Sequence, residues 1–394
     1  MERRLYREVD LQLNFMPSDP LTIGVEFELA LLDGRSLEPA HLSEKVVAEA
    51  NSPQIKPELY EHMIEVTSAI GADAHQTEAQ LRDELARLNP ICKTHGLRLT
   101  GTGLPPTIRI RDIRRTHNGR YDRLYEERRA LATRFSTLGM HIHLGMVHSE
   151  QCIRYHSFLM HFLPHLIALS ASTPFEEGVD SGLATIRPCA TESLPVAGMP
   201  YHFRDWQEYV NLCRAMYRAG SIESLKDLWW DLRPCPRLGT LEVRICDQPA
   251  TLAEGIAIVA FVHSLAHWFQ LHQSWLDEMP RPNTWRLREN KWRAMRYGLQ
   301  ARIVVNNRGE TEPICDDIRL WLDRIAPISE KLGYGGYMDE LERIMQWGNS
   351  TERQLRIWNE TENLESIARF NCDEFDAQLP SWNKTAMHTS RIGA

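Results

Sequence analysis

The amino-acid sequence predicts an α+β protein in which a curved sheet surrounds a polar site. Two observations lead to this expectation. Segments between about residues 20 and 250 alternate apolar and polar residues with the period of two that is typical of half-buried strands. The remainder, residues 251–394, consists mostly of segments with helical spacing. Because no repeat, low-complexity tract or long linker interrupts the chain, we expect one large domain over residues 1–394.

Composition disfavours several classes of protein. Hydrophobic residues make up 43% and charged residues 25%, as in ordinary globular proteins, and the net charge of -8 argues against a nucleic-acid-binding surface. The apolar stretch 256–266 contains His263 and is shorter than the roughly 20 residues that a membrane span needs. The amino terminus lacks the apolar run of a secretory signal. We therefore expect a cytoplasmic protein that binds neither nucleic acid nor membrane. The eight cysteines include no C-x-x-C pair, which indicates reduced, mostly structural thiols.

Five segments are expected to be strands, and most carry charged or imidazole side chains on one face only. They span residues 21–32, 63–70, 97–102, 140–145 and 240–246. The polar faces carry Glu26 and Glu28, then Glu65, then His141 and His143, and finally Glu242 and Arg244. Several strands with charged faces predict that the sheet curves around a shared polar site.

The expected helices lie between and after these strands. One covers the region 44–50, and another begins near Thr77, where Thr77 and Gln80 resemble a capping box, and ends at Asn89-Pro90. Longer helical segments are expected at about 150–172, 205–220, 252–275, 314–332 and 351–370.

The acidic strand faces suggest a site for a divalent cation. Glu26 and Glu28 lie roughly 6 to 7 Å apart along one face, where they repel each other unless water or a cation separates them. For one strand alone, a solvated face is the better explanation of the pattern. Several carboxylates with one imidazole suit Mg²⁺ or Mn²⁺ better than zinc, which makes His143 a candidate ligand. The alternative for His141 and His143 is a buried ring held by hydrogen bonds.

Magnesium usually binds through carboxylates together with the phosphates of a substrate, and arginines balance the remaining phosphate oxygens. Arg187, Arg233 and Arg244 are candidates for this role, although each alone is better explained as a surface or salt-bridge residue. The sequence contains no G-x-x-x-x-G-K-[ST] loop, no G-x-G-x-x-G before a helix, no H-E-x-x-H and no G-x-S-x-G. A nucleotide would therefore be held by metals and arginines on a sheet.

A basic and aromatic segment runs from residue 286 to 302. It has two explanations. It could be a lid that folds over phosphates, or a basic helix that packs its aromatic residues on the core and leaves its charges in water.

Six short motifs in order resemble the type 2 glutamate-cysteine ligases, and more closely their bacterial carboxylate-amine ligase branch. They are GVEFE at 24–28, HIHLG at 141–145, LSASTPF at 169–175, LWWDLRP at 228–234, TLEVR at 240–244 and NKWRAMRYG at 290–298. Together they cover about residues 21 to 300, whereas the helical carboxyl-terminal part matches only in general character.

The resemblance implies a glutamine-synthetase-like fold, with a curved antiparallel sheet that forms a funnel-shaped active site and helices packed outside. It also implies ATP and two or more Mg²⁺ ions, with Mn²⁺ as a substitute. By the motifs of the family, the metal ligands would be Glu26, Glu28, Glu65, His143 and Glu242, with Glu58 added although it lies outside the strand alternation. Arg187 and Arg244 would face phosphate or the substrate carboxylate, and Arg233, Asn290, Arg293 and Arg296 would contact the nucleotide.

The implied reaction joins a carboxylate to an amine. The γ-carboxylate of glutamate would attack the γ-phosphate of ATP, and an amine such as cysteine would then displace phosphate from the acyl phosphate to leave an amide. An ATP-dependent guanidino or amine kinase, which would use the same fold and metals, is the alternative, and a metal or nucleotide sensor is a third possibility. The partners would be small-molecule substrates, and the sequence also allows a homodimer.

Overall fold

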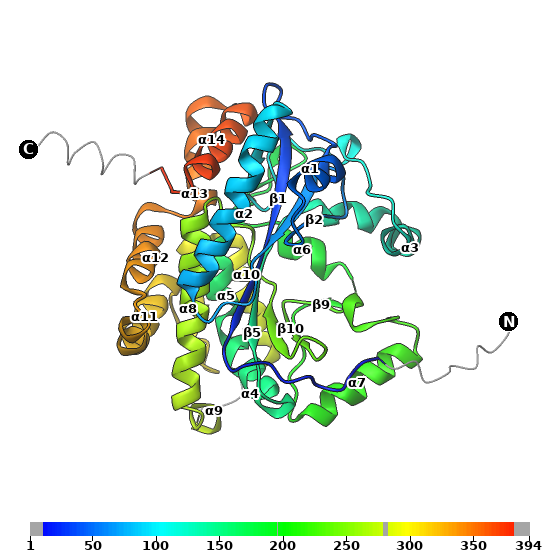
Figure 1. Cartoon of the computed structure of the whole chain (residues 1–394). Coiled ribbons are helices and arrows are strands. Elements are labelled where there is room, and N and C mark those ends of the chain that lie inside the picture. The colour runs from blue at the N-terminus through cyan, green and yellow to red at the C-terminus, as the bar shows by residue number, and fades with distance from the viewer. Residues whose placement is uncertain (1–10, 195, 279–282, 382–394) are drawn as a thin grey trace, which may run out of the picture.

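The computed structural model describes residues 11–194, 196–278 and 283–381. In this part of the chain seven strands form an antiparallel sheet in the order β10-β11-β5-β1-β3-β2, and β4 also pairs with β1 (Figure 1). The sheet strands are β1 (Ile23–Asp33), β2 (Ile55–Pro57), β3 (Met63–Thr67), β4 (Leu97–Thr100), β5 (Met140–Gly145), β10 (Leu232–Cys235) and β11 (Thr240–Val243). Two-stranded pairs are formed by β6 (Phe175–Glu176) with β7 (Val179–Asp180), β8 (Ala197–Gly198) with β9 (Trp229–Trp230), and β12 (Arg302–Val304) with β13 (Thr311–Pro313).

Helices lie on both sides of the sheet (Figure 1). They are α1 (Ser43–Ala50), α2 (Ala74–Thr94), α3 (Gly119–Arg128), α4 (Ser149–Leu159), α5 (Leu163–Ser170), α6 (Arg187–Glu192), α7 (Trp206–Arg218), α8 (Leu252–Leu271), α9 (Trp275–Glu278), α10 (Thr284–Tyr297), α11 (Ile314–Lys331), α12 (Gly335–Trp347), α13 (Ser350–Thr361) and α14 (Leu364–Ala377). Short 3₁₀ turns cover Ile110–Asp112, Arg129–Ser136, Met160–Phe162, Leu225–Asp227 and Gly298–Gln300. The prediction of an α+β protein with a strand-rich first part and a mostly helical last part is confirmed.

The strand β1 is the centre of the sheet because its 11 residues pair with β3, β4 and β5. Its odd-numbered residues, such as Val25, Phe27 and Leu29, are buried in the main core, while Glu26 and Glu28 on the other face are partly accessible. The predicted alternation of this strand is confirmed, and it separates an apolar face from a polar one.

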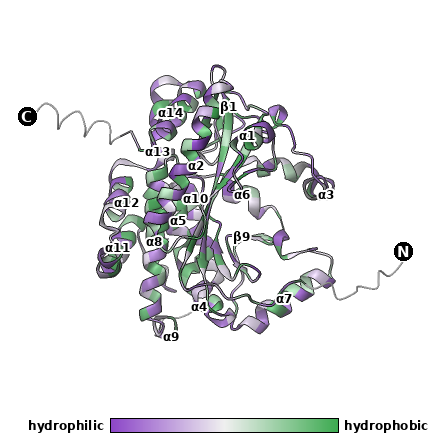
Figure 2. Cartoon of the chain, viewed as in Figure 1, coloured by the Kyte–Doolittle hydropathy of each residue, from purple (hydrophilic) through white to green (hydrophobic). Residues whose placement is uncertain are grey.

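The helices α2 and α8 cover the apolar face of the sheet. Helix α8 approaches β1 so closely that a Cβ on Gly255 would lie 2.6 Å from the Phe27 ring, so this position needs a glycine. Within the described residues α8 is long and apolar enough to cross a membrane, and Figure 2 shows it as largely hydrophobic. However, 89% of its apolar window is buried inside the protein, which is the packing of a core helix. The sequence analysis considered only the 11 residues 256–266 too short to span a membrane, whereas the helix has 20 residues. The length argument against a membrane span was therefore wrong.

Several predicted boundaries are wrong. The second, third and last predicted strands end two or three residues early, at Thr67, Thr100 and Val243. Helix α2 begins at Ala74 because Asp73, not Thr77, is its cap and accepts a hydrogen bond from the Gln76 N–H at 2.9 Å. It continues past Pro90, which lies in the last turns, where a lost hydrogen bond and a local bend cost less than in mid-helix.

Two predicted helices are each a pair of helices. The segment 150–172 breaks at the 3₁₀ turn Met160–Phe162, immediately before Pro164 in the first turn of α5. The segment 351–370 breaks at Glu362, whose φ of 48° is left-handed, and Asn363 then caps α14.

The basic segment 286–302 is largely a helix, as one of its two explanations held, but the aromatic residues of that helix are not packed on the core. The segment forms α10, which packs on α5 rather than over the polar face of the sheet. The helix buries Arg286, Asn290 and Lys291 but leaves Trp292 47% exposed, which is the reverse of a helix that packs its aromatic residues on the core.

The turn between β2 and β3 contains a buried neutral histidine. His62 is fully buried, and neither of its ring nitrogens has a hydrogen-bond partner among the described residues. Burial, with a smaller effect of the nearby His41, lowers the pKa of His62 to about 3. An unfolded histidine has a pKa near 6.5, so below that pH the unfolded state binds a proton that the folded state does not, and stability falls as pH decreases.

We therefore predict that His62→Phe reduces the acid sensitivity of the protein. Between pH 7.5 and 5.0 the wild type should lose about 2 kcal/mol of unfolding free energy through this one side chain, and the variant should not. Urea unfolding at both pH values measures the difference. The control is His117→Gln, because the His117 side chain is 70% exposed. Equal losses in the wild type and His62→Phe would contradict the prediction.

Candidate active site

The polar face of the sheet lines a cavity of about 530 Å³. Its other walls come from the turn after β2, from α3 and α6, and from the segment 220–229. Nine of the side chains predicted from the sequence line this cavity: Glu26, Glu28, Glu58, Glu65, His143, Arg187, Arg233, Glu242 and Arg244. The strand register explains this, because Glu28 pairs with Glu65 and Glu242 pairs with His143 across neighbouring strands.

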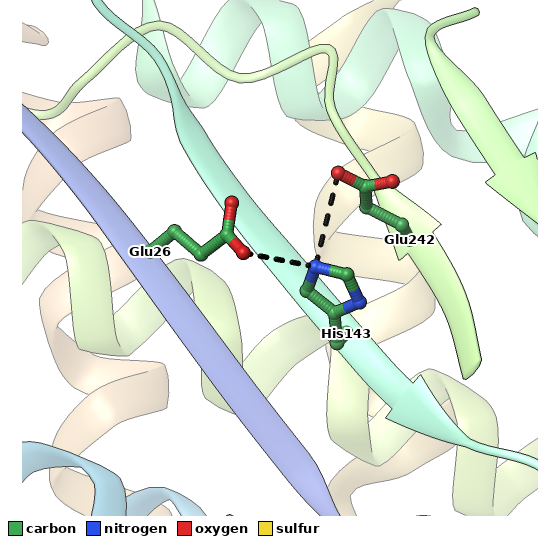
Figure 3. Close-up of side chains that lie close together, drawn as sticks. All are labelled: Glu26, His143 and Glu242. Carbon is green, nitrogen blue, oxygen red and sulfur yellow. Dashed lines mark ion pairs between the residues drawn. The ribbon is translucent and has the colours of Figure 1, made fainter. Parts of the chain in front are cut away.

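Three side chains from three strands form a compact cluster, Glu26, His143 and Glu242 (Figure 3). One ligand atom from each lies within 4.8 Å of the others. The His143 Nε2 is 3.3 Å from Glu26 Oε1 and 3.7 Å from Glu242 Oε1, while its Nδ1 is 2.9 Å from the Thr240 hydroxyl. If Nδ1 donates to Thr240, the lone pair of Nε2 points at two carboxylates, an arrangement that a cation stabilises.

Glu242 is the most strongly held acid of the cluster. Its side chain is 1% exposed, and it accepts from Arg233 at 2.7 Å and from Arg244. Burial alone would raise the pKa of Glu242, but the two guanidinium groups and His143 outweigh burial and keep this pKa well below its usual range. The carboxylate is therefore charged, as a metal ligand must be.

The second histidine of the H-x-H motif orients Glu26. His141 Nδ1 lies 2.9 Å from Glu26 Oε2, and its other nitrogen lies 3.5 Å from the Arg187 guanidinium. Burial raises the pKa of Glu26, but hydrogen bonds and charge from both histidines lower it far more. Arg187 also donates to the Arg244 carbonyl at 3.0 Å, and its guanidinium fills the space that a Cβ on Gly139 would need.

A second acidic group, Glu28, Glu58 and Glu65, also lines the cavity. Burial first, and then the charges of Glu28 and Glu65, raise the pKa of Glu58 to about 8. Burial and the Glu26 charge raise the pKa of Glu65 to about 7, although Lys56 at 3.2 Å opposes this. Such carboxyl groups repel one another without a cation, so their chemistry fits a bound divalent ion.

Three residues predicted to contact the nucleotide lie elsewhere. Asn290 bonds both the N–H and the carbonyl of Val304, Arg293 bonds Glu289 and the Arg302 carbonyl, and Arg296 stacks on Tyr297. None of the three lines the active-site cavity. The polar atoms of Asn290 and Arg293 instead attach α10 to β12. The structure therefore does not bring these three residues together with the rest of the predicted site.

Some residues of the site were missed or undervalued from the sequence. Lys56 lies on a strand of only three residues, which is too short for a detectable alternation. Tyr121, whose hydroxyl is 3.3 Å from Glu58, comes from a helix that was not predicted. The Cys235 thiol donates to Glu242 at 3.1 Å, and its position two residues after Arg233 on β10 could have indicated a shared face.

Comparisons with known proteins agree with this geometry. Residues 22–370 match the model of glutamate-cysteine ligase family 2, GCS2. A provisionally named glutamate-cysteine ligase 2 from Bdellovibrio bacteriovorus is 34% identical over 367 residues, covering 93% of this chain and 97% of the relative. A protein with the same provisional name from Thermobifida fusca is 34% identical over 378 residues, covering 94% and 95%.

A solved structure shows the same fold. It is a glutamate-cysteine ligase from Francisella tularensis in complex with AMP, with a TM-score of 0.67, 13% identity and coverage of 93% of this chain and 91% of that one. The family match spans most of the chain and includes every strand that carries the acidic cluster. The chain therefore belongs to the glutamate-cysteine ligase family 2 and is an ATP-dependent, glutamate-cysteine ligase-like enzyme.

Proposed function

We propose that this protein forms an amide between the γ-carboxylate of glutamate and an amine such as that of cysteine, through an acyl phosphate. The observation that carries this proposal is the convergence of Glu26, His143 and Glu242 with three arginines in one cavity. The substrates of this chain are inferred from the names of its relatives.

Two divalent cations fit the donor set. Glu26, His143 and Glu242 would hold one ion, and Glu28, Glu58 and Glu65 would hold the other. When bound, Mg²⁺ or Mn²⁺ would supply positive charge to the phosphates of ATP. The curved sheet would then serve as one wall of a funnel, as in a glutamine-synthetase-like fold, with α3 and α6 as the opposite wall.

The side chains of the protein would bind and orient the reactants. Arg244, which is 20% exposed, and Arg233 lie at the cavity edge of Glu242, where they would stabilise negative charge on a transferring phosphoryl group. Arg187 has a buried guanidinium beside His141 and would hold a substrate carboxylate. The cavity walls would limit water near the acyl phosphate, which would otherwise hydrolyse.

The first test removes the charge of one proposed ligand. Glu242→Gln should lower ATP turnover by roughly 10²-fold or more, because the neutral amide cannot serve as a charged ligand between two arginines. Mn²⁺ binding measured by electron paramagnetic resonance should weaken in parallel. The matched control, Glu49→Gln, changes a partly exposed acid on α1 and should retain activity. Unchanged turnover and Mn²⁺ binding in a folded Glu242→Gln protein would rule out the metal assignment.

The second test identifies the reaction. The protein should release phosphate and ADP from ATP only with glutamate and an accepting amine, and mass spectrometry should detect an amide. A screen of amines with ATP and Mg²⁺ measures both products. A stable phosphorylated guanidino or amino compound without an amide would favour the kinase alternative. Failure to release phosphate with any pair would count against the proposed ligation.

A further inference from the structure

A second cavity, of about 450 Å³, is lined in part by residues of α6 and β8. Its walls come from α6 and the residues after it, from residues 197–202, from Met160, and from α10. Among the described residues, Leu194 alone lines both cavities. The volume falls in the range typical of small-molecule sites, which is about 300 to 1,000 Å³.

Charged groups of both signs line this second cavity. Lys291 is 1% exposed, and its ammonium lies 2.6 Å from Asp231 and 2.8 Å from Glu192. The Glu192 side chain is 43% exposed, so this carboxylate is accessible, whereas Asp231 is buried. Arg288 is an exposed lining residue that has no ion pair among the described residues. The cavity therefore presents an accessible carboxylate and a guanidinium without a carboxylate partner.

The remaining surface of the cavity is apolar and adaptable. Met160, Met199 and Met295 line it together with the rim residues Tyr201 and Trp292, which are 48% and 47% exposed. Thioether side chains pack against ligands of varied shape and favour aromatic rings. Exposed aromatic residues at the edge of a cavity are typical of a binding site.

We propose that this cavity binds a zwitterionic α-amino acid with an apolar or aromatic side chain. Its carboxylate would pair with Arg288, its ammonium with Glu192, and its side chain would lie on the methionines. The charged lining residues are Glu192, Arg288 and Lys291, and Asp231, which lies outside the lining, pairs with Lys291. The charges left to face a ligand are those of Arg288 and Glu192, and a zwitterion offers an opposite charge to each. This site is distinct from the active-site cavity and does not depend on the proposed ligation.

Calorimetric titration of the full chain with three related probes tests the proposal. L-Phenylalanine carries both charges, 3-phenylpropionate lacks the ammonium, and 2-phenylethylamine lacks the carboxylate. L-Phenylalanine should bind at least about tenfold more tightly than either analogue, because each analogue leaves one charged group of the wall without its partner. Tight binding of 3-phenylpropionate or 2-phenylethylamine alone would overturn the assignment of a zwitterion, and absence of binding by all three would overturn the site.

Variants locate the binding. Arg288→Ala and Glu192→Gln should each weaken L-phenylalanine binding about tenfold, whereas Arg187→Ala in the active-site cavity should leave it within about twofold. The control Arg87→Ala removes an exposed arginine from α2 and should have no effect. Because Arg288 and the Glu192 carboxylate are solvent-accessible, both variants should fold, which circular dichroism would verify. Binding that is lost in Arg187→Ala but retained in Arg288→Ala would place L-phenylalanine in the active site and refute the proposal.

Discussion

The two-sided character of β1 is the constraint on which the rest of the structure depends. Successive side chains of a strand point to opposite faces, so Glu26 and Glu28 face the cavity while Phe27 packs beneath α8. Because β1 pairs with three other strands, its register also places His141, His143 and Glu65. The core and the active site are thus the two faces of one sheet.

The charges of the site are arranged unevenly. Around Glu242, two arginines and a histidine keep the acid ionised in a buried place. Around Glu58 and Glu65, burial and then like charges raise the pKa of each acid, and Lys56 is the only ion-pair partner found there among the described residues. The group around Glu242 is therefore preorganised by cations of the protein, whereas the group around Glu58 and Glu65 has the charge repulsion that our proposed second divalent cation would relieve.

Sequence reasoning located the strand-borne part of the site and little else. Alternation with a period of two reveals which residues share a face, and this was enough for Glu26, His143 and Glu242. Alternation cannot be recognised in very short strands, such as the one that carries Lys56. It also cannot predict which face of a helix is buried when the helix is polar on several sides. For α10, the ion pairs of Lys291 decide which face is buried, and these partners, Asp231 and Glu192, are about 60 and 100 residues away in the chain.

Because β1 is paired with other strands along both edges, its length is constrained during evolution. An inserted or deleted residue between Ile23 and Leu31 would turn one half of the strand over, so that glutamates would face Gly255 and aromatic or aliphatic groups would face the active-site cavity. The neighbouring strands β3 and β5 could not shift their register to compensate, because each is itself fixed by packing. Between Ile23 and Leu31 the sequence can therefore change by substitution of residues but not by their insertion or deletion.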